Sequence, residues 1–297
     1  MRSYNFGKAV LGTLAAAAIA TASGDARSNV KPYQGILPDQ AEFISSPDAI
    51  ISVAASGAPM QIWETLEHGE RVECMACVAV VAPLMYNENA QNREIAAWWL
   101  RRRIIGVFGP GEVYQQTLNT LANDSNPTRR AYAASAVGEF LLGNGVAPVA
   151  KALTSDSSSM VRQYAARALG RLNDDGAGAL GQAMGDSDSG VRIAALTSAG
   201  RINSFTDSVA VTKDLSDSDA IVRRRAVMLL DDMDSKDSAA AVLALAQNDT
   251  DVDVRIAACH ALGTFRDGAA ANALTAISTN DKSSLVRDMA QIALLEL

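Results

Sequence analysis

Histidine, cysteine and aromatic residues are scarce in this chain of 297 residues, and each shortage excludes a class of protein. The two histidines, His68 and His260, are too few for a metal centre built on imidazole, and neither is followed by glutamate. Aromatic residues make up only 5% of the chain, whereas hydrophobic residues make up 48%. Small apolar side chains let helices approach closely, so this composition favours thin layers of helix over one thick core.

Positive charge and long apolar runs are also in short supply. The formal net charge is −7 and the sequence pI is near 4.9, which argues against general binding to nucleic acids or anionic membranes. The apolar run from Val10 to Ala20 is too short for a membrane span, which needs about 20 residues. We therefore expect no nucleic-acid partner and no membrane span.

The first 26 residues have the pattern of a secretory signal peptide. Arg2 and Lys8 form a positive segment, an apolar run follows, and residues 20–22 (Ala-Thr-Ala) resemble a cleavage signal. Cleavage after Ala22 or Ala26 would remove this segment. We expect the mature chain to be periplasmic or secreted.

One sequence pattern returns at a nearly fixed interval through most of the chain. Its clearest copy, Asp156 to Gly170, reads DSSSMVRQYAARALG, with an Arg six residues after the Asp and then small and apolar residues at helical spacing. Successive Asp positions lie 32, 30, 31, 32 and 32 residues apart, and such a period indicates a repeat array. The positions are Asp124 and Arg130, Asp156 and Arg162, Asp186 and Arg192, Asp217 and Arg223, Asp249 and Arg255, and Asp281 and Arg287, preceded by a copy with Asn87 and Arg93.

The rest of the chain is organised around this array. Residues 27–60 are rich in proline and are interpreted as a linker with irregular pieces, in which residues 46–48 (Ser-Pro-Asp) would start a short helix. Residues 61–123 are predicted to form N-terminal helices, from Gln61 to His68 and from Glu70 to Tyr86, followed by a capping repeat. Residues 124–297 hold the regular repeats.

Each regular unit is predicted to be a pair of helices. In the clearest copy, a longer helix from Val161 to Leu172 precedes a shorter one from Ala177 to Met184. Several glycines fall near the turns, where a positive φ angle costs glycine little. These glycines are Gly143, Gly145, Gly176, Gly263 and Gly268.

Paired helices with the motifs Asp-x-x-x-x-Val-Arg and Ala-Leu-Gly resemble the short HEAT-like repeats first associated with phycobilisome lyases, over roughly residues 87–297. The resemblance implies an all-α fold, a right-handed α-solenoid of stacked antiparallel helix pairs. In that family the Asp and Arg side chains form a ladder between neighbouring repeats, which implies a structural role for the repeated Asp and Arg positions. Deoxyhypusine hydroxylases also resemble this layout, but their di-iron centre uses His-Glu pairs that this chain lacks.

Cys74 and Cys77 are the most specific candidates for chemistry. On the helix expected there, two thiols three residues apart share a face, which is compatible with a disulfide, buried thiols, a redox pair or half a metal site. Val78 stands where haem attachment would require histidine, so that chemistry is excluded. Cys259 is expected to be a small core residue and His260 an outer-face residue rather than a nucleophile and its base.

The capping repeat carries a bulky basic segment that is a candidate protein interface. Trp98 and Arg101, Arg102 and Arg103 combine the residue types favoured as interface anchors. The competing interpretation is that these arginines form a solvated face and that Trp99 lies in the core.

No set of acid, base, nucleophile and metal ligand converges in the sequence. We therefore predict an exported scaffold or protein-binding module with no catalytic site and no cofactor, whose partner is another protein. The alternative is a periplasmic thiol-disulfide or electron-transfer accessory in which Cys74 and Cys77 cycle. Leu294, Leu295 and Leu297 would form an apolar C-terminal edge suited to self-association.

Overall fold

The computed structural model describes residues 46–105, 111–173 and 175–297, and all regular structure within them is helical. None of the helices in these ranges is long and apolar enough to cross a membrane. The predicted signal peptide, residues 1–26, lies outside the described residues. The α-helices are α2 (Pro47–Ser56), α3 (Pro59–His68), α4 (Met75–Val81), α5 (Ala90–Ile105), α6 (Glu112–Asn123), α7 (Pro127–Phe140), α8 (Val146–Ser155), α9 (Ser159–Leu172), α10 (Ala177–Ala183), α11 (Ser189–Ala199), α12 (Ser208–Lys213), α13 (Ala220–Asp232), α14 (Ala239–Asn248), α15 (Val252–Phe265), α16 (Ala271–Asn280) and α17 (Ser284–Glu296).

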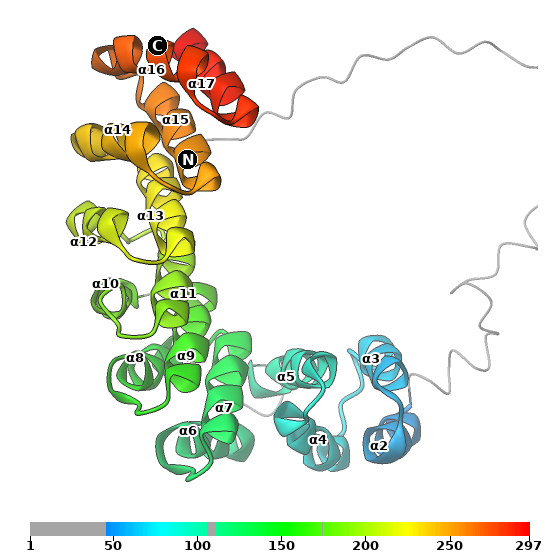
Figure 1. Ribbon diagram of the computed structural model, residues 1–297. Helices are drawn as coiled ribbons and strands as arrows, with labels where there is room; N and C mark the ends of the chain where they lie inside the picture. Colours follow the sequence, from blue (N-terminus) through cyan, green and yellow to red (C-terminus); the bar gives the residue numbers. More distant parts are fainter. Residues whose placement is uncertain (1–45, 106–110, 174) are drawn as a thin grey trace, which may run out of the picture. The chain divides into compact units, whose positions relative to one another are not determined.

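From α5 onward the helices alternate between two rows (Figure 1). The row of longer helices, called the A helices, consists of α5, α7, α9, α11, α13, α15 and α17, each packed against the next. The B helices α6, α8, α10, α12, α14 and α16 form the second row. The predicted all-α solenoid of helix pairs is therefore confirmed.

Helix α9 shows why these sequences fold as paired helices. Its apolar residues recur at helical spacing, and Val161, Ala165 and Leu169 are buried between the two rows. The chain then leaves the helix at Asn173, which has a left-handed conformation with φ of 46°. Burial of a narrow apolar stripe on each helix supplies the core that one helix pair alone would lack.

The glycines near the turns act differently from the sequence-based expectation. Gly145 and Gly176 have φ angles of −77° and −83°, whereas the left-handed positions are held by non-glycine residues such as Asn173. Gly138, inside α7, marks a close approach between helices, because a Cβ atom there would lie 2.8 Å from the Cα of Ala168 in α9. Glycine is needed in the array chiefly for packing between A helices.

The N-terminal helices agree with prediction in one place and differ in another. The short helix expected to start at residues 46–48, within the segment assigned to the linker, is present as α2, and the Ser46 hydroxyl caps it by accepting from the N–H of Ala49 at 3.2 Å. The single helix expected from Glu70 to Tyr86 is wrong. It is replaced by a loop up to Cys74, then α4, then a 3-10 helix, η2 (Ala82–Tyr86), that contains Pro83.

Candidate functional site

The repeated arginines connect neighbouring repeats through side chains. In the first regular pair, Arg130 donates from Nε and Nη2 to the two carboxylate oxygens of Asp156, each at 2.8 Å. Its Nη1 atom donates to the backbone carbonyl of Asp124 at 2.9 Å. The same two-pronged contact joins Arg162 to Asp186, Arg192 to Asp217, Arg223 to Asp249 and Arg255 to Asp281.

These ion pairs change the acidity of the aspartates. Burial alone would raise the pKa of the Asp156 carboxyl, but hydrogen bonds from Arg130 and from the N–H of Ser158 outweigh it and hold the pKa below 3.8. The pKa values of Asp186, Asp217, Asp249 and Asp281 are lowered in the same way. The ladder residues are thus occupied within the fold and are not free to bind a partner.

The ladder changes at both ends of the described array. Arg93 donates to the backbone carbonyls of Asn87 and Glu88 and stacks 3.9 Å from the ring centre of Tyr132. The Asp124 carboxylate pairs with Arg129 of its own repeat at 2.8 Å rather than with Arg93. Arg287 donates only to the backbone carbonyls of residues 281 and 282.

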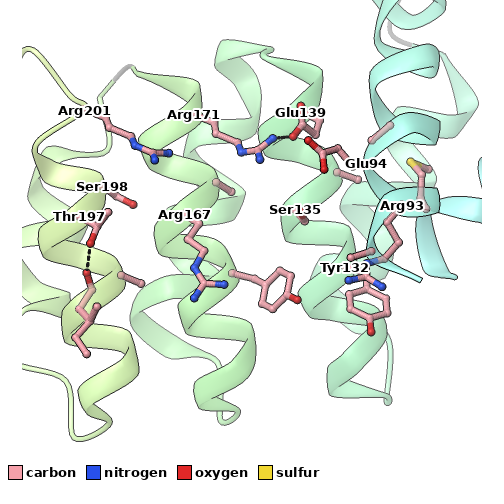
Figure 2. A pocket seen from close by; sticks show the side chains of 18 of the residues that line it. Arg93, Glu94, Tyr132, Ser135, Glu139, Arg167, Arg171, Thr197, Ser198 and Arg201 are labelled. Carbon is pink, nitrogen blue, oxygen red and sulfur yellow. Dashed lines mark hydrogen bonds and ion pairs between the residues drawn. The ribbon is translucent and has the colours of Figure 1, made fainter. Parts of the chain in front are cut away.

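A cavity of about 520 Å³ lies on the exposed side of the A helices, and we call it the A-face groove (Figure 2). Its floor consists of small residues, among them Ala136, Ala168 and Ser198, which are buried. Its walls carry charged and aromatic side chains from α5, α7, α9 and α13 and from the turn after α11. These are Arg93, Glu94, Tyr132, Glu139, Tyr164, Arg167, Arg171, Arg201 and Arg225.

The groove combines five arginines with two glutamates, so its lining carries three positive charges more than negative ones in a chain of net charge −7. Arg171 forms an ion pair with Glu139. Arg167 lies over the ring of Tyr164 at 5.7 Å. Within the described part of the chain, Arg167, Arg201 and Arg225 form no ion pair with an acidic side chain, and Arg167 and Arg201 are exposed to solvent.

Sequence reasoning missed the groove, although a signal for it exists. Apart from Arg93 and Glu94 of α5, its charged and aromatic wall residues come from three columns, which lie two, five and nine residues after each ladder arginine. The column two residues after the arginine supplies Tyr132 and Tyr164, and the column nine residues after it supplies Glu139, Arg171 and Arg201. Because these columns vary from one repeat to the next, a search for the repeated motif passes over them.

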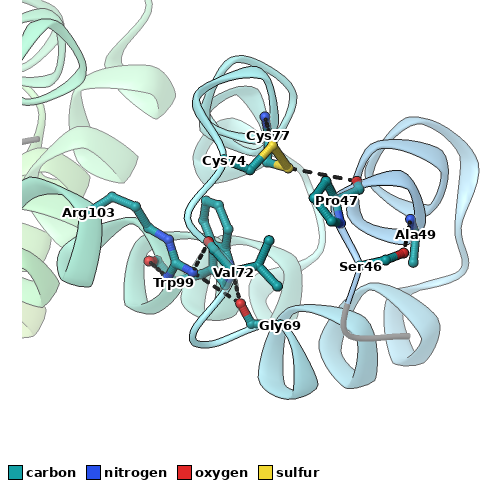
Figure 3. The surroundings of a disulfide bond; sticks show 9 residues. All are labelled: Ser46, Pro47, Ala49, Gly69, Val72, Cys74, Cys77, Trp99 and Arg103. Carbon is teal, nitrogen blue, oxygen red and sulfur yellow. Dashed lines mark hydrogen bonds between the residues drawn. A yellow bond between two sulfur atoms is a disulfide. The ribbon is translucent and has the colours of Figure 1, made fainter. Parts of the chain in front are cut away.

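Only part of the basic segment in the capping repeat lies at the protein surface. Arg103, predicted as an interface residue, is 1% exposed, and this assignment is wrong. Its guanidinium stacks on the ring of Trp99 at 3.5 Å and donates to the backbone carbonyls of Trp99, Gly69 and Val72 at 2.7 to 3.0 Å (Figure 3). Burial, the largest effect, lowers the pKa of Arg103 to about 10. Arg103 therefore fixes the loop before α4.

The other residues of that segment differ in how far they are buried. Trp99 is fully buried, and its indole N–H donates to the carbonyl of Gly69 at 2.9 Å. Trp98 and Arg101 are half-buried, whereas Arg102 is exposed. The Nε atom of Arg102 lies 3.6 Å from a carboxylate oxygen of Glu73. A continuous patch of one tryptophan and three free arginines is therefore not present.

Cys74 and Cys77 are joined as a disulfide in the structure and lie at the start of α4, close to α2 (Figure 3). Cys74 is the residue before the helix, and its Sγ accepts from the N–H of Cys77 at 3.0 Å. Cys77 is fully buried, and its Sγ lies 3.7 Å from the carbonyl oxygen of Pro47. The expected placement of both cysteines on one long helix is thus corrected, whereas their proximity holds.

The other candidates from the sequence do not form a reactive site. Cys259 is fully buried, and burial raises the pKa of its thiol to about 12. His260 is exposed, and its Nδ1 atom lies 2.8 Å from a carboxylate oxygen of Asp231. Among the described residues no group of three or more His, Cys, Asp or Glu side chains is arranged to hold a metal ion. At the C-terminal edge Leu295 is 88% exposed and Leu294 is half-buried.

Comparisons with solved structures place this fold among known helical repeats. YibA of Escherichia coli is 17% identical over 86% of this chain and 96% of its own, with a TM-score of 0.57. A HEAT-like repeats protein of the archaeon Thermococcus onnurineus is 16% identical over 74% and 96%, with a TM-score of 0.51. Kap95p, solved with RanGDP, is 12% identical over 86% and 43%, with a TM-score of 0.56.

The sequence itself identifies the family. No curated protein matches this chain. The family model for HEAT repeats, however, matches residues 114–180, 146–219 and 210–295, which together cover more than half of the chain. The matched segments coincide with the paired helices and the ion-pair ladder described above. This chain belongs to the HEAT repeat family.

Proposed function

We propose that this protein is an exported scaffold that binds another protein along the A-face groove and has no catalytic site of its own. The observation that carries the proposal is the contrast between two sets of arginines. The ladder arginines from Arg130 to Arg255 are each paired with an aspartate, whereas Arg167, Arg201 and Arg225 line a groove and have no acidic partner among the residues that the structure describes. Arginine is a favoured anchor residue in protein interfaces.

The architecture supports a binding role. Stacked helix pairs present an extended surface whose side chains vary while the fold is kept by the ladder. The solved structure of Kap95p has a similar fold and, by its description, binds RanGDP. In this chain the A-face groove combines a variable surface, a cavity and arginines without an acidic partner among the described residues.

The disulfide supports export, since such bonds persist mainly in oxidising compartments. We assign Cys74 and Cys77 a structural role, because their bond closes the first turn of α4 and the Cys77 sulfur packs against the Pro47 carbonyl of α2. The alternative, a thiol-disulfide accessory, needs a sulfur atom that an attacking thiolate can reach. Cys77 is fully buried and Cys74 is half-buried, which favours the structural role.

A photo-crosslinking experiment in the producing cells tests the proposal. A photoreactive amino acid replaces Thr197 in the groove in one variant and the exposed Lys151 on the B helix α8 in a matched control. We expect a discrete crosslinked protein from position 197, in the exported fraction, and none from position 151. Equal crosslinking from both positions, or an unprocessed chain in the cytoplasm, would contradict the proposal.

A further inference from the structure

We infer that the occupant of the A-face groove is an extended peptide segment of the partner that carries carboxylate side chains about three residues apart. The inference rests on the proposed function, since it assumes that the groove binds protein. It names the chemistry of the partner, which the fold alone leaves open. Three features of the groove carry it: the sign of its charge, the spacing of its arginines and the shape of its floor.

The charge of the groove is opposite to that of the chain. The protein as a whole carries −7, yet the unpaired charged groups on these walls are mainly arginines. Arginines in adjacent repeats repel one another unless an anion lies between them, and Arg171 and Arg201 occupy the same column in neighbouring repeats. Asp232, the next residue of that column, forms no ion pair with Arg201 within the described residues.

The chain itself shows the contact that a partner would repeat. Glu139 on α7 extends into the groove and pairs with Arg171 on α9 (Figure 2). No acidic side chain of the described residues makes the equivalent contact with Arg201, in the turn after α11, or with Arg167 on α9. A carboxylate of a bound partner could form the missing ion pair with each of these arginines, because arginine binds carboxylates through paired hydrogen bonds.

The distance between repeats sets the spacing of the partner's acids. Packed helices lie about 8–10 Å apart, so arginines of one column recur at roughly that interval. An extended peptide advances about 3.3 Å per residue, so a side chain three residues further along has moved about 10 Å. Carboxylates three residues apart in the partner therefore match the interval between Arg171 and Arg201, the two groove arginines that share a column.

The floor and walls favour an extended peptide over a helix. The buried floor residues Ala136, Ala168 and Ser198 have small side chains, which leaves room for a narrow backbone above them. The rings of Tyr132 and Tyr164, 6.1 Å apart and half-buried, form one wall. Their apolar faces suit the side chains between the acidic positions.

Fluorescence anisotropy with the full chain tests the inference. The probe is a labelled peptide with glutamate at every third position and serine or glycine between. Two comparison peptides carry glutamine instead of glutamate, or the same number of glutamates in one contiguous run. The groove variant is R167Q/R201Q, and the matched control K151Q/K213Q removes two positive charges from exposed sites on the B helices.

We expect the spaced acidic peptide to bind most tightly. The R167Q/R201Q variant should weaken this binding about tenfold or more, whereas K151Q/K213Q should change it by less than about twofold. Raising the salt from about 0.05 to about 0.5 M should weaken it severalfold, because exposed charges are screened. Equal binding of the glutamine peptide or of the contiguous peptide would overturn the inference.

Two further outcomes separate this inference from the proposed function. If position 197 crosslinks a partner and R167Q/R201Q leaves that capture unchanged, the groove binds protein but not through pairing of these arginines with the partner's acids, and the inference alone is wrong. If position 197 crosslinks nothing, the proposed function fails as well. If R167Q/R201Q instead breaks up a dimer of this chain in sedimentation, the occupant is a second copy and the inference is overturned.

Discussion

The guanidinium of Arg162 on α9 forms hydrogen bonds with both carboxylate oxygens of Asp186, at 2.7 and 2.8 Å, across the boundary between two repeats. Its third contact, from Nη1 to the backbone carbonyl of Asp156 at 2.9 Å, stays within its own repeat. One side chain thus fixes two consecutive loops. Because both partners are largely buried, removing one of them leaves an unpaired buried charge, which costs more than breaking a surface ion pair.

Replacing Arg162 with alanine should destabilise the protein strongly. Asp186 would lose its partner while remaining only 12% exposed, and an uncompensated charge of this kind costs about 3 kcal/mol. Arg224→Ala is the matched control, since its pair with Asp253 also joins two repeats but lies 35% and 63% exposed. It should cost less than about 1 kcal/mol. Urea unfolding followed by helical circular dichroism measures both, and equal losses would contradict the structural role of the ladder.

Acid should unfold the array over a narrow pH range. The pKa values of Asp156, Asp186 and three further ladder aspartates are lowered from 3.8 in the folded chain. Folding therefore favours their ionised forms, so this stabilisation is complete above the unfolded pKa and is lost as the pH falls through the folded one. The thermal midpoint of the R162A variant should depend less on pH below about 4 than that of the wild type. Parallel curves for the two proteins would argue against this linkage.

Gly138→Ala should weaken the packing between α7 and α9. The added Cβ would lie 2.8 Å from the Cα of Ala168, and backbone at that distance must move, which costs about 1–3 kcal/mol. Gly178→Ala is the control, because nothing lies within 4 Å of its added Cβ, and it should raise stability by about 0.5 kcal/mol. The free energies of unfolding of the two variants, each compared with the wild type, test this prediction. A G138A protein as stable as the wild type would show that α7 and α9 can move apart at no cost.

The repeat architecture was predictable because its determinants recur. The Asp and the Arg six residues later appear in every regular unit, and the helical spacing of Val161, Ala165 and Leu169 follows the same period. Arg103 was not predictable by this route. It looks like Arg102 in the sequence, yet it faces backbone carbonyls 31 and 34 residues earlier in the chain. Contacts that occur once, between distant segments, leave no periodic signal.

The A-face groove could not be predicted from the sequence for a related physical reason. Its walls come from different helices, so the charged residues that meet across repeats form no local motif. Arg171 and Glu139 lie 32 residues apart and meet only because α7 and α9 pack side by side. The wall positions can be located in the sequence once the ladder arginines define the register of the repeats. That their side chains face a common cavity follows only from the stacking of the A helices.

The thiol count of the unfolded chain should report the disulfide. Of the three cysteines, two are joined, so a thiol reagent in denaturant without reductant should label one residue, Cys259. After reduction it should label three. Chain isolated from the exported fraction is the sample, and C74S/C77S is the control that gives one in both conditions. Three reactive thiols before reduction would show that Cys74 and Cys77 are unpaired in the exported protein.

Asp214→Leu should stabilise the protein at pH 8 and change its pH dependence. Asp214 lies three residues before the ladder aspartate Asp217, where an earlier repeat has the buried Leu153, and it is only 7% exposed. Burial, and then the charge of Asp217, raise its pKa to about 7, although Arg192 acts in the opposite direction. Because the folded pKa exceeds the unfolded value of 3.8, the wild type is penalised increasingly as the pH rises between these values. Each pKa unit corresponds to about 1.4 kcal/mol, so the gain in the leucine variant should reach a few kcal/mol above pH 7 and fall toward a constant value near pH 4.

Asp214→Asn should remove the same pH dependence while keeping a polar group buried, with a smaller gain in stability. Unfolding free energies of the three proteins from pH 4 to 8 measure the difference, and a gap independent of pH would show that Asp214 remains ionised throughout.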